Sequence, residues 1–211
     1  MFSFGFYSIE ERMRQVTHYF TDNRNLKQNR KEHSFRLNQH EFTFVTDNGV
    51  FSKTGVDYGT MVLLEQALEE EWHGNIVDMG CGYGPISIAM KYFYPECSVT
   101  GVDVNLRALE LCTLNSELNK VHINVLESNG YEKVQGTFDG ILTNPPIRTG
   151  KKIIYSMFKD AHTHLSTGGK MLVVIRKQQG AESAKKELEE IFGNCEIARK
   201  DRGYWILRCI K

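Results

Sequence analysis

Val77-Asp78-Met79-Gly80-Cys81-Gly82-Tyr83-Gly84 is the stretch of the sequence that decides the fold. The apolar residues that lead into it, from position 75, predict a short buried strand, and Pro85 directly after it predicts the first turn of a helix. Glycines at alternating positions let a strand-to-helix turn adopt positive φ and let a ligand approach the backbone closely. A purely structural turn would use the same glycines, so the interpretation depends on the residues around them.

Strands and helices alternate on the C-terminal side of this loop. Short apolar runs predict strands over 98–104, 123–126, 138–143 and 170–175. Amphipathic segments predict helices over 85–94, 106–119, 152–164 and 181–192, and residues 165–169 are expected to end the third of them in a turn. Such alternation predicts right-handed βαβ units in a largely parallel sheet, and two final strands, 195–198 and 204–210, predict a hairpin at one edge. The expected fold class is therefore α/β, with a seven-stranded, mostly parallel sheet.

The N-terminal part of the chain has a different pattern. Residues 34–46 alternate apolar and polar side chains, which predicts a pair of strands, and Asp47-Asn48-Gly49 is a strong turn signal. A loop is expected over 51–59 and a helix over 60–71. Residues 1–33 are polar and basic, so we interpret them as a partly irregular N-terminal extension, and residues 34–211 as a single domain.

Composition disfavours several classes of protein. The formal net charge is zero, so any nucleic-acid surface must come from local clustering of charge. The five cysteines contain no C-x-x-C pair, which disfavours disulfides and zinc and fits a reducing cytoplasm. The histidines show no ligand pattern, so we expect no metal, and no apolar run approaches the ~18 residues of a membrane span. The sequence leaves both a monomer and a homodimer open.

The acidic residues around the glycine loop indicate which ligand it binds. A dinucleotide fingerprint has the spacing G-x-G-x-x-G, whereas this loop has G-x-G-x-G with Asp78 before it. A nearby carboxylate disfavours a pyrophosphate but suits a cationic or amine-bearing ligand. Asp103, at the end of the next predicted strand and about 20 residues beyond the loop, suits an acid that accepts both ribose hydroxyls. The pattern favours S-adenosylmethionine, a nucleoside that carries an amino acid, over NAD and an oxidoreductase.

The segment Asn144-Pro145-Pro146-Ile147 follows the strand predicted over 138–143. The prolines fix φ, remove two N–H groups and push Asn144 towards extended geometry. Such a stiff turn can aim the Asn144 side chain and the Pro145 carbonyl at one exocyclic amine and orient its lone pair towards a methyl group. The turn therefore predicts methylation at a planar nitrogen, although a structural strand exit would use the same residues.

Together, the loop from Asp78 to Gly84, Asp103 and the Asn144 turn resemble those of class I, Rossmann-like methyltransferases. More narrowly, the chain is similar to the small methyltransferase domain of bacterial 16S ribosomal RNA guanine-N2 methyltransferases. The residues that carry this narrower similarity are Val50-Phe51-Ser52, Asp57-Tyr58-Gly59-Thr60 and the segment 144–151. The resemblance implies a class I fold with helices on both faces of the sheet and an antiparallel edge strand, S-adenosylmethionine as cofactor, and ribosomal RNA or a ribosomal subunit as partner.

The resemblance also implies a set of site residues. Those expected to be catalytic are Asn144, Pro145, Pro146 and Ile147. Those expected to contact the cofactor are Asp57, Gly59, Thr60, Asp78, Gly80, Cys81, Gly82, Gly84, Asp103, Val104, Asn129, Gly130 and Asn144. Arg148 and Lys151, beside the catalytic turn, are expected to bind substrate phosphates.

Departures from the family pattern leave alternatives open for the substrate. Asn129 stands where the family commonly has an acid against the adenine amine, and Ile147 stands where an aromatic residue often stacks on a flipped base. The longer guanine-N2 enzymes carry a second, degenerate copy of the domain, which we do not expect in 211 residues. The alternatives are a protein-glutamine or small-molecule N-methyltransferase and, in another class, a non-catalytic RNA-binding module that retains the fold.

Overall fold

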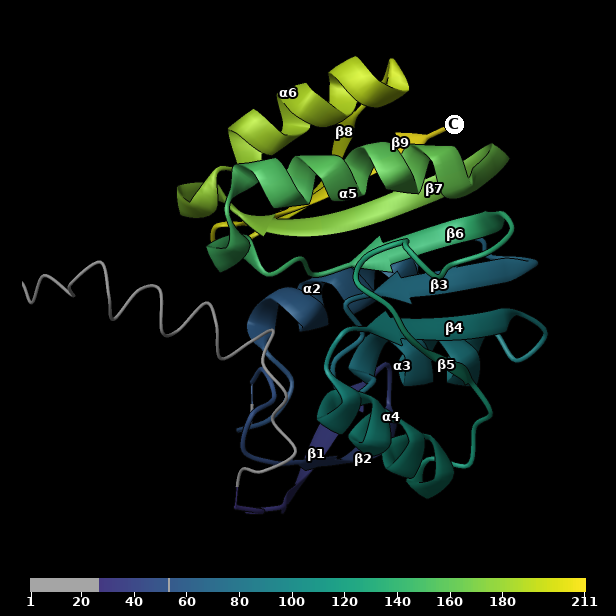
Figure 1. Ribbon diagram of the computed structural model, residues 1–211, viewed down its shortest axis with the longest axis vertical. Coiled ribbons are helices and arrows are strands. Elements are labelled where there is room, and N and C mark those ends of the chain that lie inside the picture. The colour runs from purple at the N-terminus through teal and green to yellow at the C-terminus, as the bar shows by residue number, and fades with distance from the viewer. Residues whose placement is uncertain (1–26, 53) are drawn as a thin grey trace, which may run out of the picture.

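The computed structural model describes residues 27–52 and 54–211. Its central sheet has seven strands in the order β5-β4-β3-β6-β7-β9-β8 (Figure 1). In chain order these strands are β3 (Asn75–Met79), β4 (Ser98–Asp103), β5 (Asn124–Glu127), β6 (Phe138–Thr143), β7 (Leu165–Arg176), β8 (Glu196–Asp201) and β9 (Tyr204–Ile210). Neighbours from β5 to β7 are parallel, whereas β9 runs antiparallel to both β7 and β8. The predicted α/β fold with a mostly parallel sheet and an antiparallel edge is confirmed.

Helices cover both faces of this sheet, because its central strands are apolar on both sides (Figure 1). Adjacent residues of β3 point to opposite faces, so Ile76 joins one hydrophobic core and Val77 the other. The first core also contains residues of α2 (Tyr58–Ala67), α3 (Pro85–Phe93) and α4 (Leu106–Leu118). The second contains residues of α5 (Lys151–His164) and α6 (Ala181–Phe192). Among the described residues, no helix combines the length and the apolar character that crossing a membrane requires.

Strand β7 departs from the prediction at its start. It begins at Leu165, within the stretch where the sequence predicts a turn. Leu165 pairs with Phe138, and regular pairing resumes at Lys170 after a shift in register. Gly168, at φ 81°, and Ser166, whose hydroxyl donates to the Phe138 carbonyl over 3.1 Å, lie within the irregular part. The expected turn is therefore a bulged strand entry, because a bulge can use the same glycine-rich, positive-φ residues as a turn.

A separate two-stranded sheet precedes the α/β part of the chain. Its strands, β1 (Lys31–Leu37) and β2 (His40–Thr46), are the predicted pair, and they form an antiparallel hairpin. β1 begins at Lys31 rather than at position 34, so the strand starts inside the predicted extension. The rest of that extension, up to residue 26, lies outside the described residues.

Asn115 of α4 and Asn119, the residue that caps its C-terminus, pair with the backbone of β2 as a neighbouring strand would. Asn115 accepts from the Val45 N–H at 2.7 Å and donates to the Val45 carbonyl at 3.0 Å. Asn119 makes the same pair of bonds with Thr43, at 3.0 and 2.7 Å. These amides satisfy backbone groups that an edge strand would otherwise leave open. Asn115 also donates to the Tyr83 carbonyl at 2.9 Å, so the hairpin is tied to the glycine loop.

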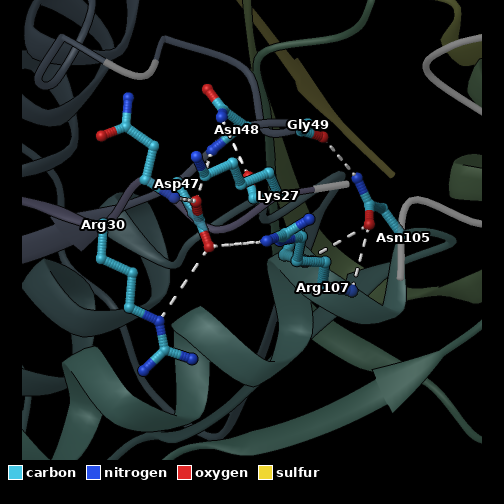
Figure 2. Close-up of polar contacts among 9 residues, drawn as sticks. Lys27, Arg30, Asp47, Asn48, Gly49, Asn105 and Arg107 are labelled. Carbon is cyan, nitrogen blue, oxygen red and sulfur yellow. Dashed lines mark hydrogen bonds and ion pairs between the residues drawn. The ribbon is translucent and has the colours of Figure 1, made fainter. Parts of the chain in front are cut away.

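A buried ion pair fastens the end of β2 to the start of α4, as Figure 2 shows. Asp47 is 2% exposed and accepts from the Arg107 guanidinium at 2.9 Å. It also accepts from the backbone N–H groups of Asn29 and Asn48, at 2.6 and 2.7 Å. Burial acts to raise the pKa of Asp47, but the backbone hydrogen bonds and Arg107 outweigh it and hold the pKa below its ordinary value.

The variant Arg107→Ala should destabilise the fold by about 3 kcal/mol, because it removes the closer charged partner of the buried Asp47 carboxylate and leaves only the half-exposed Arg30, at 4.0 Å. Urea unfolding followed by circular dichroism measures the change. Arg199→Ala is the matched control, since that guanidinium pairs with Glu65 and Glu69 at a more exposed site and should contribute less than about 1 kcal/mol. Equal losses in the two variants would contradict the role given to the buried pair.

The same pair predicts a pH dependence. A carboxyl group whose pKa is lowered by folding contributes stability above its unfolded pKa and loses that contribution as the pH falls through the folded value. The gap in unfolding free energy between the wild type and Arg107→Ala should therefore be full near neutral pH and shrink in acid. A gap that widened as the pH fell would contradict this prediction.

Candidate functional site

The glycine loop joins β3 to α3 at the carboxyl edge of the sheet. Gly80, Gly82 and Gly84 have φ angles of 79°, 56° and 95°, a region that residues with side chains disfavour. A Cβ at Gly84 would lie 2.6 Å from the Sγ of Cys112, so this glycine serves the packing of α3 on α4. A Cβ at Gly80 or Gly82 would have no atom within 4 Å, so these two leave open space for a ligand beside the backbone.

Asp103 ends β4 next to this loop and is 5% exposed. One of its carboxylate oxygens accepts from the Gly82 N–H at 2.9 Å, and the other accepts from the Asn105 N–H at 2.9 Å. Burial raises the pKa of Asp103 in spite of these backbone bonds. The carboxylate keeps further acceptor capacity and lines a cavity of about 440 Å³, so it can accept from adjacent hydroxyl groups of a ligand.

Four other predicted cofactor residues line the same cavity: Gly80, Val104, Asn129 and Gly130. Asn129 is exposed, and its amide donates to Glu132 at 2.6 Å. The cavity is also lined by residues that the sequence analysis did not single out, among them Tyr131, Ile153, Ser156, Met157, Asp160 and His164. Most of them lie on α5, where the sequence signals only an amphipathic helix and does not reveal which cavity the helix faces.

Asp78 lies behind the loop rather than on a cavity wall. It is 1% exposed, and one carboxylate oxygen accepts from both the N–H and the hydroxyl of Ser87, at 3.0 and 2.6 Å. These bonds hold the first turns of α3. The other oxygen has no partner among the described residues, and burial, aided by the charge of Asp103, raises the pKa of Asp78 to about 7. An unpaired buried acceptor at this place favours a cationic group nearby.

Asn144 follows β6 and faces the start of α2. Its amide nitrogen lies 3.2 and 3.3 Å from the two carboxylate oxygens of Asp57 and 2.9 Å from the Thr60 hydroxyl oxygen. The Thr60 hydroxyl itself donates to Asp57 at 2.6 Å, so it can only accept from Asn144. A carboxylate also only accepts, which fixes the amide orientation of Asn144. Its carbonyl oxygen is therefore the group that is left to bind a donor.

Asp57 is the residue that organises this contact. It caps α2 by accepting from the N–H groups of Gly59 and Thr60 at 3.0 and 3.2 Å. The helix consequently begins at Tyr58, ahead of the predicted start at Thr60. The same carboxylate thus caps the N-terminus of α2 and accepts a hydrogen bond from the Asn144 amide.

A second, smaller cavity lies between Asn144 and the glycine loop, with a volume of about 30 Å³. The predicted residues that line it are Asp57, Thr60, Gly80, Cys81, Gly82 and Asn144. Gly80 lines both cavities, so an elongated ligand can extend from Asp103 across the loop to Asn144. Phe51, which is 54% exposed, and Tyr83, whose buried hydroxyl has no partner among the described residues, are further wall residues that sequence reasoning missed.

The remaining predicted residues lie in and beside the turn that follows β6. Pro145 is buried, and Pro146 lines the larger cavity. Ile147 packs against the core under α5 and α6 and lines neither cavity beside the glycine loop. Arg148 lies with it in η2 (Ile147–Thr149). Lys151 is exposed and donates to Ser183 at 3.3 Å.

The described walls fit S-adenosylmethionine. Asp103 can accept from the ribose hydroxyls, and the open backbone at Gly80 and Gly82 leaves room for the amino-acid portion. Asn144 stands at the far end of the smaller cavity, where a methyl acceptor would approach.

Comparisons with known proteins agree with this geometry. A family model described as "Methyltransferase small domain" matches residues 41–208. An uncharacterized protein of Bacillus subtilis, YbxB, is 40% identical over 197 residues, which cover 92% of this chain and 98% of that protein. Ribosomal RNA small subunit methyltransferase C of Erwinia tasmaniensis is 31% identical over 175 residues, which cover 81% of this chain and 50% of that protein.

A solved structure shows the same likeness. It is the T. thermophilus 16S rRNA N2 G1207 methyltransferase (RsmC) in complex with AdoMet and guanosine. It superposes with a TM-score of 0.79 at 27% identity, over 86% of this chain and 50% of that one. The chain thus spans about half the length of the curated ribosomal RNA methyltransferases that it matches.

Asp103→Ala should weaken the binding of S-adenosylmethionine about 10- to 100-fold, because a hydrogen bond to a charged group contributes about 1.5–3 kcal/mol. Isothermal titration calorimetry measures the affinity. Asn124→Ala is the control, since Asn124 is an exposed residue of β5 that lines neither cavity, and it should leave the affinity unchanged. An equal loss of affinity in the two variants would contradict the contact assigned to Asp103.

Proposed function

The chain belongs to the methyltransferase small domain family, and on that premise we propose that it methylates an exocyclic amine of a base in ribosomal RNA, with guanine N2 as the favoured target. As a member of the family it is a methyltransferase that uses S-adenosylmethionine, so the proposal concerns the acceptor of the methyl group. The observation that carries it is the fixed amide of Asn144. With its nitrogen held by Asp57 and Thr60, its oxygen is directed to accept from a planar amine.

The chemistry required of the protein is modest. S-adenosylmethionine supplies an electrophilic methyl group on a sulfonium. Asn144 Oδ1, together with the Pro145 carbonyl, orients the lone pair of the amine and stabilises the positive charge that develops on its nitrogen. The new N–C bond forms as the C–S bond breaks, and the amine loses its proton to solvent afterwards. The Asp57 carboxylate, which binds the Asn144 amide, adds negative charge near that nitrogen.

Two observations support RNA over a protein or a small molecule as the acceptor. The relatives named ribosomal RNA small subunit methyltransferase C match most of this chain, and the solved relative was crystallised with guanosine. The exposed Phe51 also lines the smaller cavity, as Asn144 does. It offers a flat apolar surface for a base at a site where Ile147, turned into the core, offers none. We place the reaction in the cytoplasm with the ribosome.

Asn144→Ala should reduce methyl transfer at least 100-fold while the affinity for S-adenosylmethionine stays within about 3-fold, since the lost oxygen acts on the amine. The measurement is transfer of labelled methyl from the cofactor to ribosomal RNA, to ribosomal subunits and to protein fractions. Asn194→Ala is the matched control, because Asn194 bonds to Ile210 before the edge strand β8 and should leave transfer unchanged. Full activity of Asn144→Ala, or label that enters only protein, would overturn the proposal.

Asp57→Asn tests the orientation of Asn144 separately. An amide in place of the carboxylate can donate as well as accept, so the Asn144 amide is no longer held in one orientation. We expect kcat to fall about 10- to 100-fold, as a misplaced catalytic group does. The KM for RNA should change little, since Asp57 acts through Asn144. A change confined to KM would show that Asp57 binds substrate instead.

A further inference from the structure

The carboxyl edge of the sheet continues beyond Asn144, away from the cofactor cavity. The ends of β6 and β7 lie side by side, because Thr143 pairs with Val173 in parallel register. Arg176, the last residue of β7, pairs with Tyr204, the first residue of β9. Asn144, Arg176 and Tyr204 therefore stand at the same edge on three neighbouring strands (Figure 1).

Two tyrosines and two arginines form a connected cluster at this edge, which we call the Arg–Tyr rim (Tyr58, Arg176, Arg202 and Tyr204). The tyrosine ring centroids are 5.8 Å apart. The Arg176 guanidinium lies 5.6 Å from the ring centroid of Tyr204, and that of Arg202 lies 5.1 Å from the ring centroid of Tyr58. Each guanidinium is thus held over an aromatic ring at low entropic cost, with its N–H groups left for a ligand.

The rim is in direct contact with the residues that hold Asn144. Tyr58 follows Asp57 in the chain and begins α2. A Cβ at Gly59 would lie 2.9 Å from a ring atom of Tyr204, so the ring packs against the backbone of the same turn. A ligand on the rim would therefore lie next to the methyl-accepting position.

The two arginines of the rim form no ion pair within the described residues. Arg176 and Arg202 are both exposed, and neither pairs with a described carboxylate, unlike Arg107, Arg199 and Arg208. The acids near the rim act on Tyr58: Asp201 is hydrogen-bonded to its side chain, and Glu65 adds a second negative charge. The guanidinium groups themselves are therefore left to bind a ligand.

We propose that the Arg–Tyr rim binds the phosphates of the RNA strand that flank the target nucleotide. Guanidinium groups bind phosphate through paired N–H donors, and stacked guanidinium groups are already oriented for it. Enzymes that act on an unstacked base hold the neighbouring backbone, because phosphate contacts set the register. The cofactor cavity occupies the β3-β4-β5 half of the edge, so a strand that delivers a base to Asn144 has the β7-β9-β8 half available. The proposal rests on the proposed function and adds to it the surface that would bind the RNA backbone.

The test is the salt dependence of RNA binding by the double variant Arg176→Ala/Arg202→Ala. Fluorescence anisotropy with labelled fragments of 16S ribosomal RNA gives the affinity at several salt concentrations. We expect the slope of log K against log salt to become shallower by about 1.4, since each phosphate contact with a single strand contributes about 0.7. The KM for RNA should rise, while kcat at saturating RNA and the affinity for S-adenosylmethionine stay unchanged, which also reports that the variant is folded.

The matched control is Arg36→Ala/Lys186→Ala, which removes the same charge from exposed residues of β1 and α6. It should keep the wild-type slope. If both double variants changed the slope equally, or if neither changed it, the rim would not be the phosphate site. Displacement of labelled RNA by an acidic peptide more readily than by unlabelled RNA would also overturn the proposal, because it would assign the rim to a protein partner.

The two proposals can fail separately in this experiment. If the wild type binds RNA and the rim variant binds it more weakly, but no methyl group is transferred to RNA, the rim proposal stands and the proposed function is wrong. If methyl groups are transferred to RNA and the rim variant has an unchanged KM, the proposed function stands and the rim proposal is wrong.

Discussion

The parallel alignment of β5, β4, β3, β6 and β7 is the constraint on which the site depends. Parallel strands all end at one edge of the sheet, so Gly80 after β3, Asp103 at the end of β4 and Asn144 after β6 meet there although the chain separates them. Backbone bonds reinforce this arrangement, since the N–H groups of Gly80 and Cys81 both donate to the Val102 carbonyl, at 2.8 and 2.9 Å. The loop is thereby turned across the end of β4, which brings open backbone next to the acid. The backbone geometry of the sheet and the loop therefore determines at which edge the cofactor site lies.

The N-terminal hairpin is joined to this edge of the sheet by hydrogen bonds from α4 and its caps. Asn115 and Asn119 bind the backbone of β2, and Asn115 also binds the Tyr83 carbonyl in the glycine loop. At the other end of the hairpin, Asn105 caps α4 and donates its backbone N–H to the Asp103 carboxylate at 2.9 Å. Its side-chain amide donates to the Gly49 carbonyl at 2.9 Å (Figure 2). The hairpin is consequently bound to both sides of the loop by hydrogen bonds. These contacts join the segment between β2 and α2, which carries Asp57, to the residues around the cofactor cavity.

Sequence reasoning predicted the fold because the fold is encoded locally, whereas the roles that it gave to the site residues stay predictions. Alternating strands and helices specify the sheet, and Asp103 and Asn144 follow strands that the apolar pattern reveals. What it missed depends on contacts between distant segments. Asn144 and Asp57 are separated by 87 positions, and no periodicity indicates that a helix-capping carboxylate also fixes an amide. Asp78 is next to the loop in sequence but points behind it to Ser87, and Ile147 turns into the core, because strand and turn geometry decide the direction of each side chain.

The distribution of charge shows why a zero net charge does not argue against a nucleic-acid partner. Several cations form ion pairs with buried acids. Arg107 pairs with Asp47, and Lys170 and Arg208 pair with Glu70, which is 8% exposed. Those pairs lie within the fold, and their fields largely cancel outside it. The arginines of the Arg–Tyr rim lie over aromatic rings and form no ion pair within the described residues, so their charge remains at the surface. An aromatic ring positions a guanidinium without neutralising it, and this lets a chain of zero net charge carry exposed cations near Asn144.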